Sequence, residues 1–120
     1  MAKILIVDDS PAETVKLKEM LVRQGHETLE ASDGEQGVHA AVTNKPDLVL
    51  MDVVMPGTNG FQATRQLSRH PETSHIPVVI VSTKDQETDR VWGRRQGAKD
   101  YLTKPVDEAE LIAVIDRLLA

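Results

Sequence analysis

The stretch Asp47-Leu-Val-Leu-Met-Asp-Val-Val-Met-Pro-Gly-Thr-Asn-Gly60 decides the fold class of this chain. It contains a short apolar run, 48–51, which is typical of a strand buried on both faces. The run ends on the carboxylate of Asp52 and is followed by the turn signals Pro56-Gly57 and Asn59-Gly60. In open α/β sheets, chemistry collects where the strands end. Asp52 taken alone fits a helix cap, a metal ligand or a nucleophile, and the rest of the chain must decide between these roles.

The composition describes one ordinary globular domain. The chain has 120 residues, of which 40% are apolar, and it has no cysteine, so neither a disulfide framework nor a thiolate metal site is available. No apolar run approaches the length of about 18 residues that a membrane span needs. The first residues have the pattern of a strand and lack a cleavage region, so we expect a cytoplasmic protein without membrane insertion. The net charge of −5 argues against nucleic-acid binding as the main function.

Strand patterns and helix patterns alternate along the whole chain. We expect strands at 3–7, 27–31, 48–51, 77–81 and 100–103, and helices at about 11–24, 34–44, 59–69, 85–96 and 107–119. Strict alternation implies a parallel sheet with right-handed crossovers and helices on both faces. The first, third and fourth strands are continuous apolar runs and belong in the centre, whereas the mixed second and fifth strands belong at the edges. This predicts a doubly wound α/β fold, flavodoxin-like, with strand order 2-1-3-4-5.

Local signals mark several helix boundaries. Ser10-Pro11-Ala12-Glu13 offers an N-cap, a proline at the first helical position and a reciprocal capping-box acid. Ser32 to Glu35 repeats the capping-box spacing. Gly93 falls inside the expected helix 85–96 and should weaken it.

Four of the five expected strands end on groups that handle phosphate or metal, namely Asp8-Asp9, Asp52, Ser82 and Lys104. Three carboxylates at one sheet edge repel one another by about 3 kcal/mol per pair at about 5 Å and an effective dielectric near 20. A hard divalent cation removes that repulsion, and oxygen-only ligands indicate Mg²⁺. The cation leaves a carboxylate free to attack phosphorus. Lys104 and the Ser82 hydroxyl then hold the oxygens of the arriving phosphoryl group.

This joint motif resembles the receiver domains of bacterial two-component response regulators, of the single-domain chemotaxis (CheY-like) type. The matching elements are Asp-Asp after the first strand, Asp-x-x-Met-Pro-Gly after the third, Ser-Thr after the fourth and Lys-Pro after the fifth. The resemblance covers the chain, so it implies one response regulatory domain over 1–120 with no output domain.

The resemblance also implies roles for the strand-end residues. Asp52 is the expected phosphoacceptor for a histidine kinase. Asp9 and Asp52 are the expected Mg²⁺ ligands, with Asp8 acting through water and the Val54 carbonyl completing the site. Lys104 is the expected phosphate-binding amine, and its peptide bond to Pro105 is expected to be cis.

A conformational switch is implied as well. The Ser82 hydroxyl is expected to move onto the phosphoryl group, and Tyr101 to turn into the space that Ser82 leaves. The fourth helix would then change its packing. It carries Arg90, Trp92 and Arg94, which we predict as a partner surface, although a solvated helix face explains these residues equally well.

The helix surfaces carry a finer resemblance. Residues 60–66 and 83–97 are similar to those of stand-alone receivers in chemotaxis systems that control type IV pilus twitching motility. This implies a chemotaxis-type histidine kinase as phosphoryl donor, a protein target such as the pilus motor machinery, and a monomer. It implies no enzyme beyond weak self-phosphotransfer and autophosphatase activity. Departures at Val54 and Lys84 leave the lifetime of the phosphoryl group open.

Several other functions remain as alternatives. An aspartyl phosphatase of the haloacid-dehalogenase kind needs a second aspartate where Val54 stands. A flavodoxin-like mononucleotide binder needs a neutral phosphate loop after the first strand, where Asp8-Asp9 would repel the phosphate. Within the receiver family, the chain could instead drain phosphate from a sister regulator, or act as an interaction module that is never phosphorylated.

Overall fold

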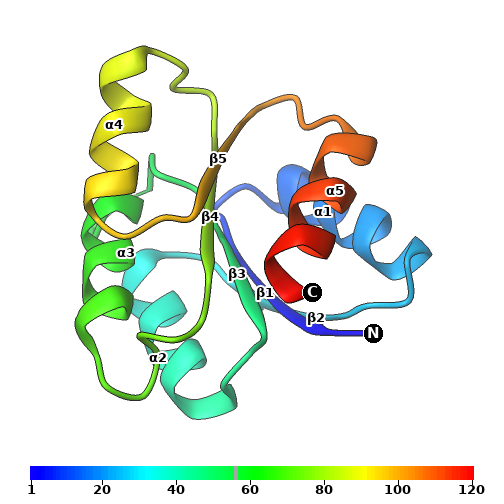
Figure 1. The fold of residues 1–120 in the computed structure, drawn as a ribbon, viewed down its shortest axis with the longest axis horizontal. Coiled ribbons are helices and arrows are strands. Elements are labelled where there is room, and N and C mark those ends of the chain that lie inside the picture. Colours follow the sequence, from blue (N-terminus) through cyan, green and yellow to red (C-terminus); the bar gives the residue numbers. More distant parts are fainter. Residues whose placement is uncertain (56) are drawn as a thin grey trace.

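The computed structural model describes residues 1–55 and 57–120 (Figure 1). Pro56, part of the turn signal after the third strand, lies outside the described residues. The strands are β1 Lys3–Val7, β2 Glu27–Ala31, β3 Leu48–Met51, β4 Val78–Ser82 and β5 Asp100–Thr103. The helices are α1 Pro11–Arg23, α2 Gly34–Asn44, α3 Gly60–Arg69, α4 Glu87–Arg95 and α5 Glu108–Leu119. All strand pairs are parallel and the order is β2-β1-β3-β4-β5, which confirms the predicted topology.

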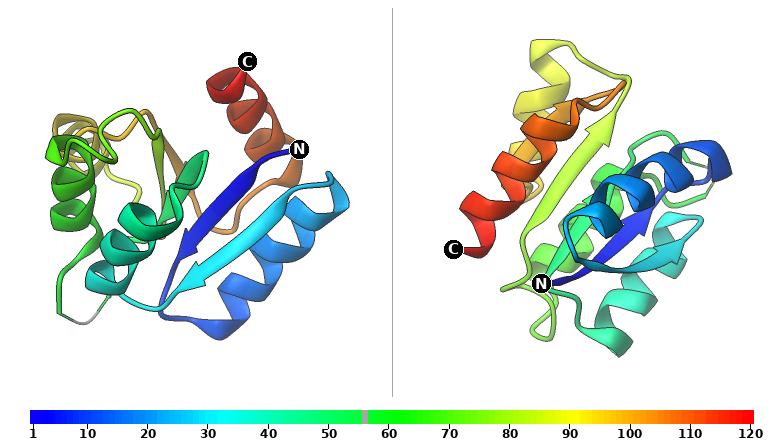
Figure 2. Two further views of the ribbon diagram at one scale, coloured as in Figure 1. Left: turned by 90° about the horizontal axis from the view of Figure 1, so that it is seen from below. Right: turned by 90° about the vertical axis from the view of Figure 1, so that its right-hand side faces the viewer.

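Helices cover both faces of the sheet, as the alternating pattern predicts (Figure 2). One face of the sheet packs against α1 and α5, through Leu17, Leu21, Leu111 and Ile115. The opposite face packs against α2 and α3, and α4 stands beside α3 (Figure 1). The central strands β3 and β4 are buried throughout, and β1 is buried except at Lys3, because these strands carry apolar residues on both faces. Among the described residues, no helix combines the length and apolar character that crossing a bilayer requires.

Helix caps agree with the sequence at α1 and differ by one residue at α2. The Ser10 hydroxyl accepts a hydrogen bond from the Glu13 amide at 3.4 Å, and Pro11 begins α1. The second helix is capped by Asp33, whose carboxylate accepts from the Gln36 amide at 2.8 Å. The prediction of a capping box from Ser32 to Glu35 is therefore wrong. The cap is Asp33, because its carboxylate is a charged acceptor three residues before the otherwise unbonded amide of Gln36.

Gly93 has a role that helix propensity alone did not suggest. It is the one described buried residue of α4, and a Cβ at this position would lie 2.8 Å from the Ile80 side chain and 3.2 Å from the Tyr101 ring. The glycine therefore lets α4 lie close to β4 and β5. The prediction that Gly93 only weakens α4 is incomplete, since a larger side chain could not pack here without moving the helix.

Candidate functional site

An acidic cluster lies at the carboxyl ends of β1 and β3. The pairing of Val7 with Met51 places the next residues, Asp8 and Asp52, beside each other, and the Asp52 amide donates to the Val7 carbonyl at 2.9 Å. Asp8, Asp9 and Asp52 each offer a carboxylate oxygen, and these atoms lie within 4.8 Å of one another. Asp8 and Asp52 are buried, whereas Asp9 is exposed. The structure thus brings together the three carboxylates that the sequence singled out.

Glycine also fixes the backbone at this cluster. A Cβ at Gly60, the first residue of α3, would lie 1.9 Å from the Asp52 carbonyl oxygen. The Gly60 amide donates to the Val53 carbonyl at 3.1 Å. The start of α3 therefore packs directly on the backbone of Asp52, and only glycine allows that approach.

Lys104 lies between two of the carboxylates. Its ammonium is 2.7 Å from Asp8 Oδ2 and 3.7 Å from Asp52 Oδ1, and its side chain is 9% exposed. Burial lowers the pKa of Lys104, but the hydrogen bond to Asp8 and the charges of Asp52 and Asp8 outweigh it, so the pKa is raised. The peptide bond from Lys104 to Pro105 is cis, as the resemblance implied. The repulsion expected from the sequence took only the three carboxylates into account. The Lys104 ammonium offsets part of that repulsion.

The charged form of Asp52 is disfavoured even though Lys104 lies close to it. Burial raises the pKa of Asp52, the Lys104 ammonium lowers it, and the Asp8 carboxylate raises it again. The Val53 amide donates to Asp52 Oδ1 at 2.9 Å and also favours the charged form. The net pKa is above the usual value for an aspartate, so folding favours protonation of this side chain.

Asp52→Asn should therefore stabilise the metal-free protein by about 1 kcal/mol at neutral pH. A raised folded-state pKa means that protonation adds stability below the unfolded-state pKa, and this stability is lost as the pH rises through the folded-state pKa. An uncharged amide avoids that loss. Urea unfolding in a chelator should show the gain at neutral pH, and the gain should shrink as the pH falls toward the unfolded-state pKa of aspartate. Equal stability of both proteins at neutral pH would contradict a destabilising carboxylate.

Ser82 and Tyr101 meet through the backbone of Lys84. The Ser82 hydroxyl is fully buried and accepts from the Lys84 amide at 3.2 Å. The Tyr101 hydroxyl donates to the Lys84 carbonyl at 2.6 Å. Burial raises the pKa of Tyr101, whose side chain is buried. The sequence did not single out this backbone link, because it uses main-chain atoms that any residue at position 84 would supply.

The three residues predicted as one partner surface do not share a face of α4. Arg90 binds β5, donating to the Thr103 hydroxyl at 2.7 Å and to the Tyr101 carbonyl at 3.3 Å, and it lies over the Tyr101 ring. Arg94 lies 3.8 Å from Asp100, also in β5. Trp92 is half exposed and lies about 200° around the helix from either arginine, since each residue turns the helix by about 100°. Arg90 and Arg94 therefore share one side of α4 and contact β5 there, with Trp92 on another side, and the role of these residues as a partner surface stays a prediction.

The donor set fits Mg²⁺ by its chemistry. All three side chains offer carboxylate oxygen, the ligand that this cation prefers, and their negative charge exceeds what Lys104 neutralises. The side chain of Val54 is 56% exposed, and the ligand role of its carbonyl stays a prediction. Among the described residues, this is the one group of three or more acids or histidines with such spacing.

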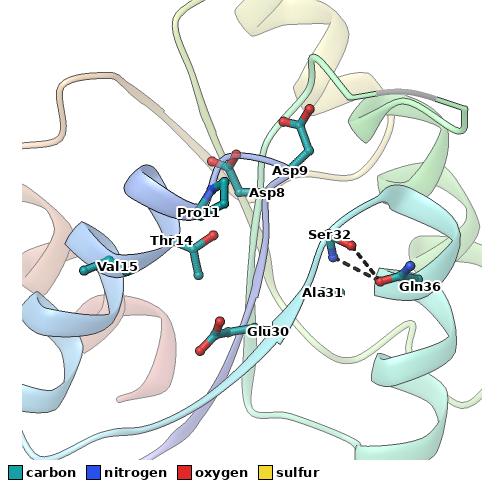
Figure 3. Close-up of a pocket in the computed structure, with 9 residues that line it drawn as sticks. All are labelled: Asp8, Asp9, Pro11, Thr14, Val15, Glu30, Ala31, Ser32 and Gln36. Carbon is teal, nitrogen blue, oxygen red and sulfur yellow. Dashed lines mark hydrogen bonds between the residues drawn. The ribbon is translucent and has the colours of Figure 1, made fainter.

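A pocket of about 360 Å³ opens beside the cluster (Figure 3). Asp8 and Asp9 lie at one end, and Thr14 and Glu30 line the pocket from α1 and β2. Neither Asp52 nor Lys104 is among the residues that line it. The residue that the sequence predicts as phosphoacceptor therefore does not line this pocket.

Comparison with known proteins agrees with the geometry. Residues 4–116 match the response regulator receiver domain. Protein PilH of Pseudomonas aeruginosa is 65% identical over 120 residues, which is 100% of this chain and 99% of PilH. Response regulator PleD of Caulobacter vibrioides is 41% identical over 117 residues, and this match spans 26% of PleD.

A solved receiver structure has the same fold as this chain. The receiver domain of sensor histidine kinase PA1611 from Pseudomonas aeruginosa PAO1, with a magnesium ion coordinated in its active site cleft, superposes with a TM-score of 0.91 at 30% identity. The superposition covers 98% of this chain and 97% of that one. With the family match, the full-length relative, the strand order and the acidic cluster in agreement, this chain belongs to the response regulator receiver domain family.

Proposed function

We propose that this receiver domain accepts a phosphoryl group on Asp52 from a histidine kinase and signals by altered binding to a protein target. The observation that carries the proposal is the arrangement of three carboxylates within 4.8 Å, with the Lys104 ammonium 3.7 Å from Asp52. A structural ion pair needs one acid for one lysine. Three acids around one lysine leave a surplus of negative charge that suits a cation and an incoming phosphoryl group.

The chemistry follows from the positions of the side chains. An Asp52 oxygen attacks the phosphorus of a phosphohistidine, a new P–O bond forms, and the P–N bond breaks, leaving an acyl phosphate and a free imidazole. Bound Mg²⁺, held by Asp8, Asp9 and Asp52, would neutralise the carboxylates and the phosphoryl oxygens. Lys104 would exchange its contact with Asp8 for a phosphoryl oxygen, and the Ser82 hydroxyl would donate to another. Each transfer consumes the acceptor, so we propose no enzyme activity beyond slow self-dephosphorylation.

Magnesium should raise the melting temperature of the wild-type protein. Because the cation binds the folded cluster, stability should grow by about 1.4 kcal/mol for each tenfold increase in free metal above its dissociation constant. Calorimetry over a magnesium series measures this, and Asp9→Asn should reduce the gain. If potassium at matched ionic strength stabilised the protein equally, the effect would be general screening of charge rather than a site.

Val54→Asn should shorten the lifetime of the phosphoryl group. Val54 follows Asp52 by two residues, and its exposed apolar side chain offers no group that orients an attacking water. An amide at this position could hold that water, so loss of phosphate should accelerate several-fold. Val22→Asn, at a similarly exposed valine on α1, is the matched control. Equal decay rates in wild type and Val54→Asn would show that the position does not control access.

The biological setting proposed is control of type IV pilus twitching motility in the cytoplasm, as a monomer, with a chemotaxis-type histidine kinase as donor and the pilus motor machinery as target. The likeness to PilH over the full chain supports this setting. The test is expression in a Pseudomonas aeruginosa strain that lacks PilH, where the wild-type chain should restore wild-type twitching and Asp52→Asn should not. A phosphate sink is the alternative: it would shorten the lifetime of the phosphorylated kinase in vitro without binding a motor protein.

A further inference from the structure

A groove runs between α2 and α3, on the face of the sheet opposite α1 and α5. Two neighbouring hollows of about 510 and 410 Å³ share Val38, Gln66 and His70 as lining residues. The two helices pack side by side in Figures 1 and 2. Val38 and Val42 supply an apolar wall from α2, and neither side chain is fully buried. The hollows therefore form one continuous surface that the core does not fill.

The α3 side of this groove is basic in an acidic protein. The chain carries 19 acidic and 14 basic residues, yet α3 has two arginines and no acid. Both arginines, Arg65 and Arg69, are exposed and line the second hollow. Across residues 1–55 and 57–120 neither has an ion pair, whereas Arg23, Arg94 and Arg117 each have one. Acids outnumber bases in this chain, and yet these two guanidinium groups beside the apolar wall are unpaired among the described residues. They are therefore available to pair with carboxylates of another protein.

The groove also reaches the loop that carries the phosphoacceptor. Thr58, in the connection between β3 and α3, lines the first hollow. A Cβ at Gly34, the first residue of α2, would lie 2.4 Å from the Thr58 carbonyl oxygen. The loop is therefore held against α2 at one end and against Asp52 at Gly60. This surface is separate from the contacts that Arg90 and Arg94 make with β5.

We propose that the α2–α3 groove docks an acidic amphipathic helix of a partner protein. Two packed helices leave a groove that a third helix fills, and α3 is about 15 Å long, which matches about 10 residues of a helical partner. The apolar side chains of the partner would contact Val38 and Val42, and its flanking carboxylates would pair with Arg65 and Arg69. Glu35 at the far wall of the groove disfavours acids there and so sets the orientation.

The test is a titration of the ¹⁵N-labelled full chain with a synthetic helical peptide. The peptide carries leucine at i, i+3, i+4 and i+7 and glutamate at the flanking positions, and a second peptide has lysine in place of every glutamate. The acidic peptide should shift the amide resonances of Val38, Val42, Arg65, Arg69 and His70, and the basic peptide should not. Shifts confined to other helices, or equal binding of both peptides, would overturn the proposal.

Charge reversal gives the second arm of the test. Arg65→Glu with Arg69→Glu should weaken binding of the acidic peptide about tenfold, because both carboxylate pairs become repulsive. Arg95→Glu is the matched control, since Arg95 is an exposed arginine of α4 with no ion pair among the described residues. Unchanged melting temperatures would show that both variants fold. Arg95→Glu changes the net charge half as much as the double variant, so a loss of about threefold on Arg95→Glu would mean that net charge, and not the groove, determines binding.

Discussion

Asp52→Asn should abolish the phosphoryl adduct that the wild-type protein gains from acetyl phosphate and Mg²⁺. The amide nitrogen and oxygen of asparagine are poor nucleophiles, and neither Asp8 nor Asp9 can replace Asp52. Asp8 is buried and bonded to Lys104 at 2.7 Å, and Asp9 is exposed and forms no ion pair with Lys104 among the described residues. Intact-mass spectrometry should find one phosphoryl group on the wild type, lost on treatment with hydroxylamine, and none on the variant.

The control for this experiment is a second aspartate on the surface. Asp116→Asn changes an exposed acid of α5 and should gain the adduct as the wild type does. An adduct of unchanged amount on Asp52→Asn would remove Asp52 from its proposed role. An adduct stable to hydroxylamine would mean that the phosphoryl group is on a hydroxyl rather than on a carboxylate.

Lys104→Met should destabilise the metal-free protein by about 3 kcal/mol. The lysine ammonium is the cation nearest to Asp8 and Asp52, and both of these carboxylates are buried. Removing one partner of a buried ion pair leaves uncompensated charge, which costs about 3 kcal/mol or more. Methionine keeps the length and the apolar stem of the side chain, so packing changes little. Urea unfolding in a chelator measures the loss.

The same variant should bind Mg²⁺ more tightly, because the ammonium no longer competes for the carboxylates. Excess magnesium should therefore recover part of the lost stability. The matched control is the double variant Asp8→Asn with Lys104→Met, in which the charge near Asp52 is balanced again and the loss should be about 1 kcal/mol or less. If the single and double variants were equally unstable, the loss would come from packing of the lysine stem and not from charge.

The sequence by itself determined the fold and the membership of the candidate site. Apolar runs at 3–7, 48–51 and 77–81 can be buried on both faces, so they occupy the centre of the sheet in any parallel arrangement. Because parallel strands end at one edge, Asp8, Asp52 and Lys104 are expected at that same edge, although their mutual contacts are not fixed by it. Both the strand order and the placement of the strand-end residues follow from the hydrophobic pattern and from the alternation of strands and helices, which can be read from the sequence.

The tertiary structure alone decided the contacts that depend on close packing. Lys104 pairs with Asp8 across 96 residues of sequence, although β3 and β4 lie between β5 and β1 in the sheet. Arg90 joins β5 instead of solvent, because the small Gly93 brings α4 close to Tyr101. At α2, the cap moves from Ser32 to Asp33, since the stronger acceptor takes the free amide. Each outcome depends on side-chain distances of a few ångströms, which the spacing of residues along the chain does not contain.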